Sequence, residues 1–168
     1  MDYNIRYYRN QYGVHVLEDG LMNMRQFWRY LGITGGIAIA LGAWLVWERS
    51  GITFNLMLAG AFFVLFYTWP LKYYGLGEPA VLLVWGPLMV GGTYYVITGS
   101  WSWDVCWLSL VFALGPTTVL FGKHIDKAPA DEAKGVRTLP VIMGDTLSRY
   151  STLAMLVAQY LRAPDEAL

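Results

Sequence analysis

The chain has 168 residues and no net formal charge, and it is 56% hydrophobic but only 14% charged. This composition and a mean hydropathy of +0.39 are typical of a membrane protein and exclude an ordinary water-soluble domain. The balance of 12 basic and 12 acidic residues argues against a nucleic-acid-binding protein, because that class carries a basic surface. The single cysteine, Cys106, cannot form an internal disulfide and is expected to be a small buried side chain.

Long intervals without charged residues predict the membrane-spanning helices. Uncharged intervals of 18, 22, 25 and 18 residues follow Arg29, Arg49, Glu78 and Asp104 in turn. A helix that crosses the hydrocarbon needs about 20 residues. The intervals predict four spanning helices and a fifth with a shorter uncharged core, at about 30–48, 53–70, 79–98, 103–121 and 147–161. The predicted fold class is all-α: a polytopic helical membrane protein with about five transmembrane helices in a single membrane domain, 1–168.

The basic residues predict the orientation of these helices. If the helices cross up and down, the segments 1–29, 71–78 and 122–146 lie on one face of the membrane. That face carries ten of the 12 Lys and Arg residues, counting Arg149 at its edge. Loops rich in Lys and Arg stay in the cytoplasm, so we expect all three segments to face it.

The segment 122–146 is interpreted as a cytoplasmic loop and is the strongest functional signal in the chain. Between Lys123 and Arg137 it contains four basic residues, three acidic residues and His124. Carboxylates hold divalent cations, and lysine and arginine hold phosphate oxygens. The loop therefore predicts a site for a diphosphate at the membrane surface. For His124 two roles stay open, a metal ligand or, more simply, a solvated loop residue.

The shorter loop Trp69–Glu78, with the sequence WPLKYYGLGE, is expected to face the charged loop across one cavity. Pro70 should end the second span, and the glycines of the loop permit backbone conformations closed to other residues. Lys72 either binds an anion or extends to the interface to satisfy the orientation rule. Glu78 either contributes to the site or caps the following helix.

Two segments carry a family resemblance. They are Gly75–Gly99 (GLGEPAVLLVWGPLMVGGTYYVITG) and Asp131–Gly144 (DEAKGVRTLPVIMG). In order and spacing they resemble the UbiA-type intramembrane prenyltransferases, and within that superfamily the dihydroxynaphthoate polyprenyltransferases of menaquinone synthesis. The resemblance covers about Trp69–Gly144. It implies a nine-helix bundle, two Asp-rich cytoplasmic motifs, Mg²⁺, and transfer of a polyprenyl group from its diphosphate to an aromatic acceptor.

The resemblance, together with the placement of charge, implies roles for individual residues. The candidate catalytic residues are Lys72, Tyr73 and Tyr74. The candidates for binding the substrate diphosphate are Lys72, Lys123, Lys127 and Arg137. The candidates for holding Mg²⁺ are Asp2, Asp126 and Asp131.

Both acidic motifs depart from the family pattern. The first is Asn-Asp-x-x-Asp in the family, and if Asp2 matches its first acid, Ile5 takes the place of the second. Glu18 and Asp19 follow later in the same segment as substitutes. The second motif has acids four residues apart, but Lys127 stands four residues before Asp131.

The nearest acid in the second motif, Asp126, precedes Asp131 by five residues. On an ideal helix this spacing places the two carboxylates about 140° apart. Pro129 lies between them and is expected to distort the helix, which would let them converge.

On the family plan the chain begins near the end of the second helix and stops after the seventh, so it is expected to be a partial chain. The expected partners are a polyprenyl diphosphate, an aromatic acceptor, the lipid bilayer and a complementary membrane chain, with no nucleic acid. The expected location is a bacterial inner membrane. The alternative function is a non-catalytic scaffold or regulatory subunit derived from the same fold. A transporter is less favoured, because the charges lie in loops rather than at the membrane midplane.

Overall fold

The computed structural model describes residues 16–17, 19–49 and 51–161. Asp2, Ile5 and Glu18 lie outside the described residues. The chain divides into two compact units, Met1–Ser50 and Gly51–Leu168. Every regular element within the described ranges is helical, which confirms the all-α class.

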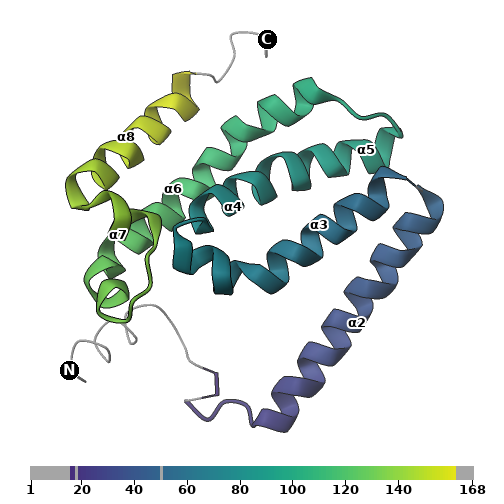
Figure 1. Cartoon of the computed structure of the whole chain (residues 1–168). Coiled ribbons are helices and arrows are strands. Elements are labelled where there is room, and N and C mark those ends of the chain that lie inside the picture. The colour runs from purple at the N-terminus through teal and green to yellow at the C-terminus, as the bar shows by residue number, and fades with distance from the viewer. Residues whose placement is uncertain (1–15, 18, 50, 162–168) are drawn as a thin grey trace. The chain divides into compact units, whose positions relative to one another are not determined.

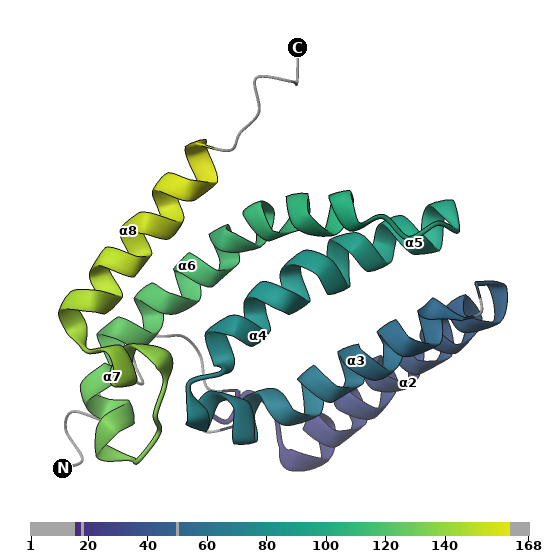
Figure 2. The same cartoon turned by 45° about the horizontal axis from the view of Figure 1, so that its top comes forward.

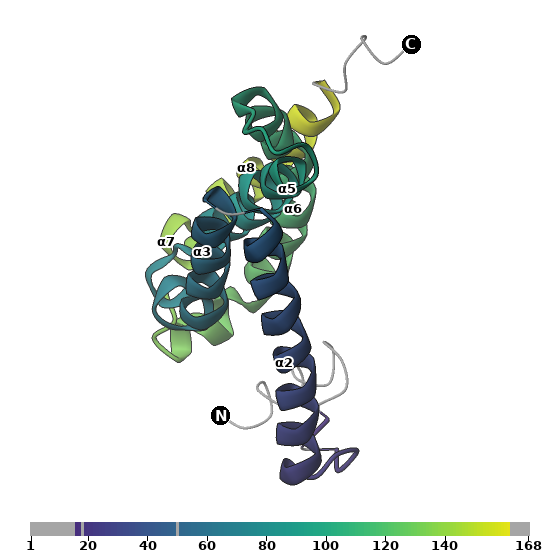
Figure 3. The same ribbon diagram turned by 90° about the vertical axis from the view of Figure 1, so that its right-hand side faces the viewer.

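Among its described residues the first unit has one helix, α2 (Met24–Glu48), which runs without a break in Figure 3. It begins six residues before the predicted start because Asn23 and Gln26 form a capping box. The Asn23 side chain accepts from the backbone N–H of Gln26, and the Gln26 side chain accepts from that of Asn23, both at 2.9 Å. The uncharged interval marks the part of the helix suited to the membrane and does not mark the helix start.

The described part of the second unit contains four helical rods and a short corner. Its elements are α3 (Ile52–Phe66), η1 (Tyr67–Leu71), η2 (Lys72–Tyr74), α4 (Gly77–Leu83), η3 (Val84–Gly91), α5 (Gly92–Thr98), α6 (Trp103–Ala133), α7 (Leu139–Met143) and α8 (Asp145–Leu161). α4, η3 and α5 follow one another without a gap. Figures 1 and 2 show α3, the α4–α5 rod, α6 and α8 side by side in this order.

Four helical stretches within the described ranges are long and apolar enough to cross a membrane. They are Met24–Glu48, Ile52–Tyr74, Gly77–Thr98 and Trp103–Ala133. The predicted fifth helix is present as α8, but it is not among these candidates.

The sequence predicts that the segment 122–146 is a loop. This prediction is wrong for residues 122–133, because α6 continues to Ala133. Its 31 residues extend roughly 46 Å, whereas the hydrocarbon is about 30 Å thick. One end of α6 therefore extends beyond the apolar layer, and its charged C-terminal turns are the part suited to do so. Charged residues can therefore remain helical where their side chains reach water.

Glycines allow the α4–α5 rod to approach its neighbours closely. A Cβ on Gly86 would lie 3.1 Å from the backbone oxygen of Ser109, and one on Gly91 would lie 2.7 Å from Sγ of Cys106. On the other side, a Cβ on Gly92 would lie 3.3 Å from the side chain of Leu56. Small residues at helix contacts are typical of membrane bundles. The prediction that Cys106 is a buried apolar side chain is confirmed.

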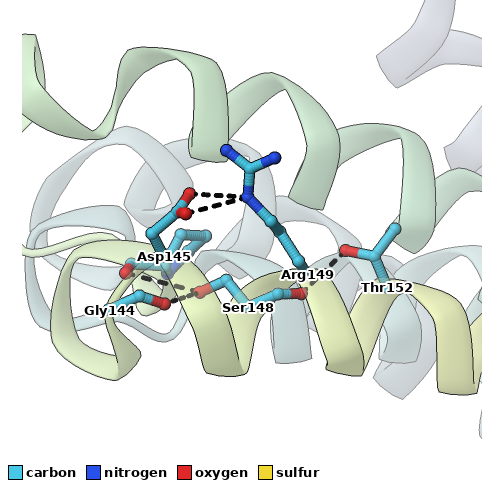
Figure 4. Close-up of polar contacts among 6 residues, drawn as sticks. Gly144, Asp145, Ser148, Arg149 and Thr152 are labelled. Atoms are coloured by element: carbon cyan, nitrogen blue, oxygen red, sulfur yellow. Dashed lines mark hydrogen bonds and ion pairs between the residues drawn. The ribbon is translucent and has the colours of Figure 1, made fainter.

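A short corner connects α6 to α8, and Figure 4 shows the polar contacts that begin α8. The Ser148 hydroxyl is fully buried and donates to the backbone oxygen of Gly144 at 2.7 Å. Arg149 Nε lies 2.9 Å from both carboxylate oxygens of Asp145, one turn earlier and in the open. The buried hydroxyl fixes the corner, while the exposed ion pair adds little to stability.

Candidate functional site

The turn between α3 and α4 places Lys72 and the two tyrosines. Trp69 has an extended backbone (φ −143°, ψ 129°), which interrupts the helical run, and a cis peptide bond joins it to Pro70. The apolar stretch suited to the membrane continues past this point to Tyr74. Lys72 is half-buried, whereas Tyr73 and Tyr74 are 39% and 68% exposed. The tyrosines therefore project from the turn and are not part of a packed core.

Gly75 brings this turn against the segment that follows α6. Its φ of +73° is a conformation that favours glycine. A Cβ at this position would lie 2.5 Å from Cδ1 of Ile142 and 3.3 Å from the backbone oxygen of Arg137. The expected approach of the shorter loop to the charged segment is present in the structure.

The segment from Asp131 to Gly135 ends α6. Gly135 adopts φ +71°, and its N–H donates to the backbone oxygen of Glu132 at 2.9 Å. The N–H of Val136 donates to the backbone oxygen of Asp131, also at 2.9 Å. This hydrogen-bond pattern is a Schellman motif. It turns the chain sharply and places Arg137 next to the Gly75 turn.

A cluster of lysines forms around Lys127. The ammonium groups of Lys72, Lys123 and Lys134 repel that of Lys127, whereas the carboxylate of Asp131 attracts it. Lys72 comes from the turn, and the other members come from the last turns of α6 and the residue after it. The structure thus brings together three of the four predicted diphosphate-binding residues. We call this group of Lys72, Lys123, Lys127, Lys134 and Asp131 the lysine cluster.

The fourth predicted diphosphate-binding residue, Arg137, lines an open pocket of about 600 Å³. Tyr74 from the turn and Glu132 from α6 share its lining, and residues of α7 complete it. Of the candidate catalytic residues, Tyr74 therefore shares this pocket with Arg137, whereas Tyr73 is not part of its lining.

The two candidate metal ligands within the described part of the chain lie in different environments. Asp131 is buried, and its Oδ2 has no hydrogen-bond partner among the described residues. Asp126 is exposed and lines a separate pocket of about 440 Å³ with Asp145 and Arg149. An unpartnered buried carboxylate oxygen suits one ligand position on Mg²⁺, which usually takes one or two carboxylates together with phosphate oxygens and water.

Pro129 does not end α6, which is one α-helix from Trp103 to Ala133 with Pro129 inside it. The five-residue spacing therefore keeps the Asp126 and Asp131 carboxylates about 140° apart around the axis. Among the described residues, no group of three or more His, Cys, Asp or Glu side chains could hold a metal ion. The third candidate, Asp2, lies outside those residues.

Glu78 and His124 form a buried pair that the sequence analysis of neither residue predicted. His124 Nδ1 donates to Oε1 of Glu78 across 2.6 Å, and their side chains are 4% and 1% exposed. The expectation of a solvated histidine is wrong, and Glu78 makes no side-chain hydrogen bond that caps α4. The only signal in the sequence was position: each residue stands at the border of an uncharged interval, where antiparallel neighbours bring their ends together.

Comparison with known proteins identifies the family of this chain. Residues 14–163 match the UbiA prenyltransferase family. The chain belongs to this family. The match extends well beyond the segments that carried the resemblance. Together with the four apolar helices, it makes this UbiA-family chain a multi-pass membrane protein.

Several relatives are similar to this UbiA-family chain. It is 31% identical over 145 residues to the 2-carboxy-1,4-naphthoquinone phytyltransferase of Synechocystis sp., covering 84% of this chain and 41% of that protein. It is 28% identical over 89 residues to the UbiA prenyltransferase domain-containing protein 1 homolog of Drosophila melanogaster, covering 53% and 25%. For the protein of that name in Ailuropoda melanoleuca, identity is 33% over 87 residues, covering 51% and 26%. The chain thus spans less than half the length of these relatives. No solved structure matches it.

Proposed function

We propose that this chain forms part of a site that transfers a polyprenyl group from its diphosphate to an aromatic, dihydroxynaphthoate-like acceptor in quinone synthesis. The lysine cluster is the observation that carries the proposal. Lys72 from the turn and Lys123 and Asp131 from α6 all interact electrostatically with Lys127. Family membership and the naphthoquinone phytyltransferase relative support the choice of reaction and acceptor class.

Electrostatics explains why such a cluster suits a diphosphate. Lysines that repel one another are stabilised when an anion of high charge lies between them. When the allylic C–O bond breaks, its electron pair leaves with the diphosphate. Lys72, Lys123 and Lys127 would stabilise the negative charge that then grows on the leaving group, with Arg137 contributing from the neighbouring pocket.

Mg²⁺ is the proposed cofactor, and Asp131 is its best ligand among the described residues. Oδ2 of Asp131 is buried without a hydrogen-bond partner there and lies in the same cluster as the lysines. Mg²⁺ held by Asp131 would neutralise part of the negative charge of the diphosphate. Asp126 and Asp2 remain predicted ligands, with a weaker contribution assigned to Asp126 because it lies on another side of α6.

An apolar pocket of about 410 Å³ is a suitable place for the isoprenoid part of the donor. It lies between α3 and the α4–η3 segment, and Tyr67 and Trp85 are part of its lining. Tyr67 opens the same turn that carries Lys72, so the apolar and charged regions adjoin. Tyr73 and Tyr74 are proposed to stabilise the allylic cation by about 0.5–2 kcal/mol each. A ring carbon of the acceptor then bonds to that cation and releases a proton, or carbon dioxide from a ring carboxylate.

A segment exchange tests the proposal. Residues 69–144 of this chain replace the matching segment of the Synechocystis relative, and the chimera is assayed with Mg²⁺, a polyprenyl diphosphate and dihydroxynaphthoate. Prenylated product, detected by mass spectrometry, is expected from the chimera and not from the same chimera with Lys72→Gln and Lys127→Gln. A folded chimera without product would contradict the proposal.

A non-catalytic scaffold is the second candidate, and the divergence of Asp126 and Asp131 around α6 is the observation that favours it. It predicts a folded chimera with no transfer activity. Restoring the family spacing with Lys127→Asp should then recover activity, because Asp131 and an acid four residues earlier share one helix face.

A further inference from the structure

The buried Glu78–His124 pair connects the two parts of the chain that carry the lysine cluster. Glu78 is the second residue of α4, six residues after Lys72, and His124 stands on α6 between Lys123 and Lys127. Oε2 of Glu78 has no hydrogen-bond partner among the described residues, so the bond from His124 to Oε1 is the one that holds this carboxylate.

The start of α4 is in turn packed onto the turn that carries Lys72. A Cβ on Gly77 would lie 3.6 Å from Cα of Lys72 and 3.8 Å from the ring of Tyr67. The backbone N–H of Leu76 donates to the oxygen of Leu71 at 2.9 Å. A displacement of Glu78 along α6 would therefore carry Lys72 with it.

We propose that the Glu78–His124 pair is a positioning device that fixes the register of α4 against α6, and thereby holds Lys72 beside Lys123 and Lys127. The inference rests on the proposed function, because it concerns the geometry of the same anion site. Neither residue contacts the substrate. Both act through the placement of Lys72, whose misplacement by about 1 Å would be costly for a site that depends on converging charges.

A hydrogen bond between two helices specifies one register of α4 against α6. Apolar contacts alone allow several registers. Replacing a buried polar pair with apolar residues of similar volume often leaves stability unchanged. The variant Glu78→Met/His124→Phe therefore separates the two roles: it keeps the packing and removes the directional bond. Glu78→Gln is the matched rescue, because its amide oxygen can still accept from His124 Nδ1.

The first measurement is the distance between nitroxide labels at Leu76→Cys and Ala133→Cys, in the full chain in nanodiscs with Cys106→Ala. Both labelled positions are exposed, one at the start of α4 and one at the end of α6. A narrow distance distribution is expected for the parent and for Glu78→Gln, and a broad or shifted one for Glu78→Met/His124→Phe. An unchanged distribution in that double variant would overturn the proposal, whatever the chain binds.

The second measurement is the affinity of the same proteins for inorganic diphosphate with Mg²⁺. The double variant is expected to bind about tenfold more weakly, and Glu78→Gln within about twofold of the parent. Thr117→Val is the control: it removes a buried hydroxyl contact to Ala113 within α6, away from the cluster. It should lower stability and leave affinity unchanged. A parent that fails to bind contradicts the proposed function, whereas equal binding by parent and double variant contradicts the positioning role.

Discussion

Glu78 and His124 stand 46 residues apart in the chain, yet a 2.6 Å hydrogen bond joins their buried side chains. The bond connects the first turn of α4 with the charged end of α6. This bond thus holds together two segments that the sequence marks as functional, the Lys72 turn and the C-terminal turns of α6. The pairing of Glu78 with His124 is not among the roles that the sequence left open for them.

Single replacement of either partner should destabilise the protein. Glu78→Ala leaves a buried imidazole unpaired and His124→Ala leaves a buried carboxyl unpaired, at a cost of about 1–3 kcal/mol each. Because both changes break the same bond, the double variant should cost less than the sum of the two. Reversible unfolding in mixed micelles measures all four proteins. Strictly additive costs would show that the two side chains do not interact.

Substitution at Gly75 should be the most costly of three glycine-to-alanine changes near the site. Gly75 has a φ of +73°, and a Cβ added there would lie 2.5 Å from Cδ1 of Ile142. Gly135→Ala keeps a similar φ of +71° but meets open space, and Gly122→Ala meets neither constraint. We expect losses of about 2–4 and about 1–2 kcal/mol for the first two, and no loss for Gly122→Ala. The melting temperature of each variant ranks them, and equal values for Gly75→Ala and Gly135→Ala would exclude the close contact.

Gly91 and Cys106 should show compensating substitutions. Gly91→Ala introduces a Cβ 2.7 Å from Sγ of Cys106, so it should cost about 1–3 kcal/mol. Cys106→Ala removes that sulfur, and in its presence the cost of Gly91→Ala should fall by at least half. Gly36→Ala, where nothing lies within 4 Å, is the matched control. Its stability should be unchanged or slightly raised, because alanine favours helix.

The two candidate metal ligands on α6, Asp126 and Asp131, should differ in their effect on metal-dependent binding. Asp131→Asn removes a buried carboxylate from the lysine cluster, so Mg²⁺ should no longer strengthen diphosphate binding by the variant. Asp126→Asn alters an exposed side chain of a separate pocket, and most of the Mg²⁺ effect should persist. Calorimetric titration of diphosphate with and without Mg²⁺ measures both. A larger effect from Asp126→Asn would assign the metal to the other pocket.

Charge and hydropathy predicted the helices because spanning segments must exclude charge over a fixed length. They misplaced the start of α2 and the C-terminal end of α6, because both depend on local hydrogen bonds. The capping box at Asn23 begins α2, and the glycine at position 135 ends α6. Both residues can be recognised in the sequence as a helix start and a helix stop, but they lie outside the uncharged intervals.

The candidate site was predictable where it depends on residue type and order, and unpredictable where it depends on pairing. Lys72, Lys123 and Lys127 were predicted from basic residues in loops of one face, and the structure places them in one cluster. The Glu78–His124 bond depends on the register between two helices, which neither composition nor spacing specifies. The sequence also does not show that Pro129 stays inside α6, because a proline can lie within a helix without ending it.

The central claim is that Lys72 and Lys127 belong to one diphosphate site, and calorimetric titration with inorganic diphosphate and Mg²⁺ tests it most directly. The purified chain in nanodiscs is compared with Lys72→Gln, Lys127→Gln and Arg149→Gln, each of which removes one positive charge. Arg149 lines the separate pocket and serves as the charge-matched control. The account predicts saturable binding that weakens about tenfold or more in each lysine variant and stays unchanged in Arg149→Gln. Equal losses in all three variants, or no binding by the parent chain, would contradict it.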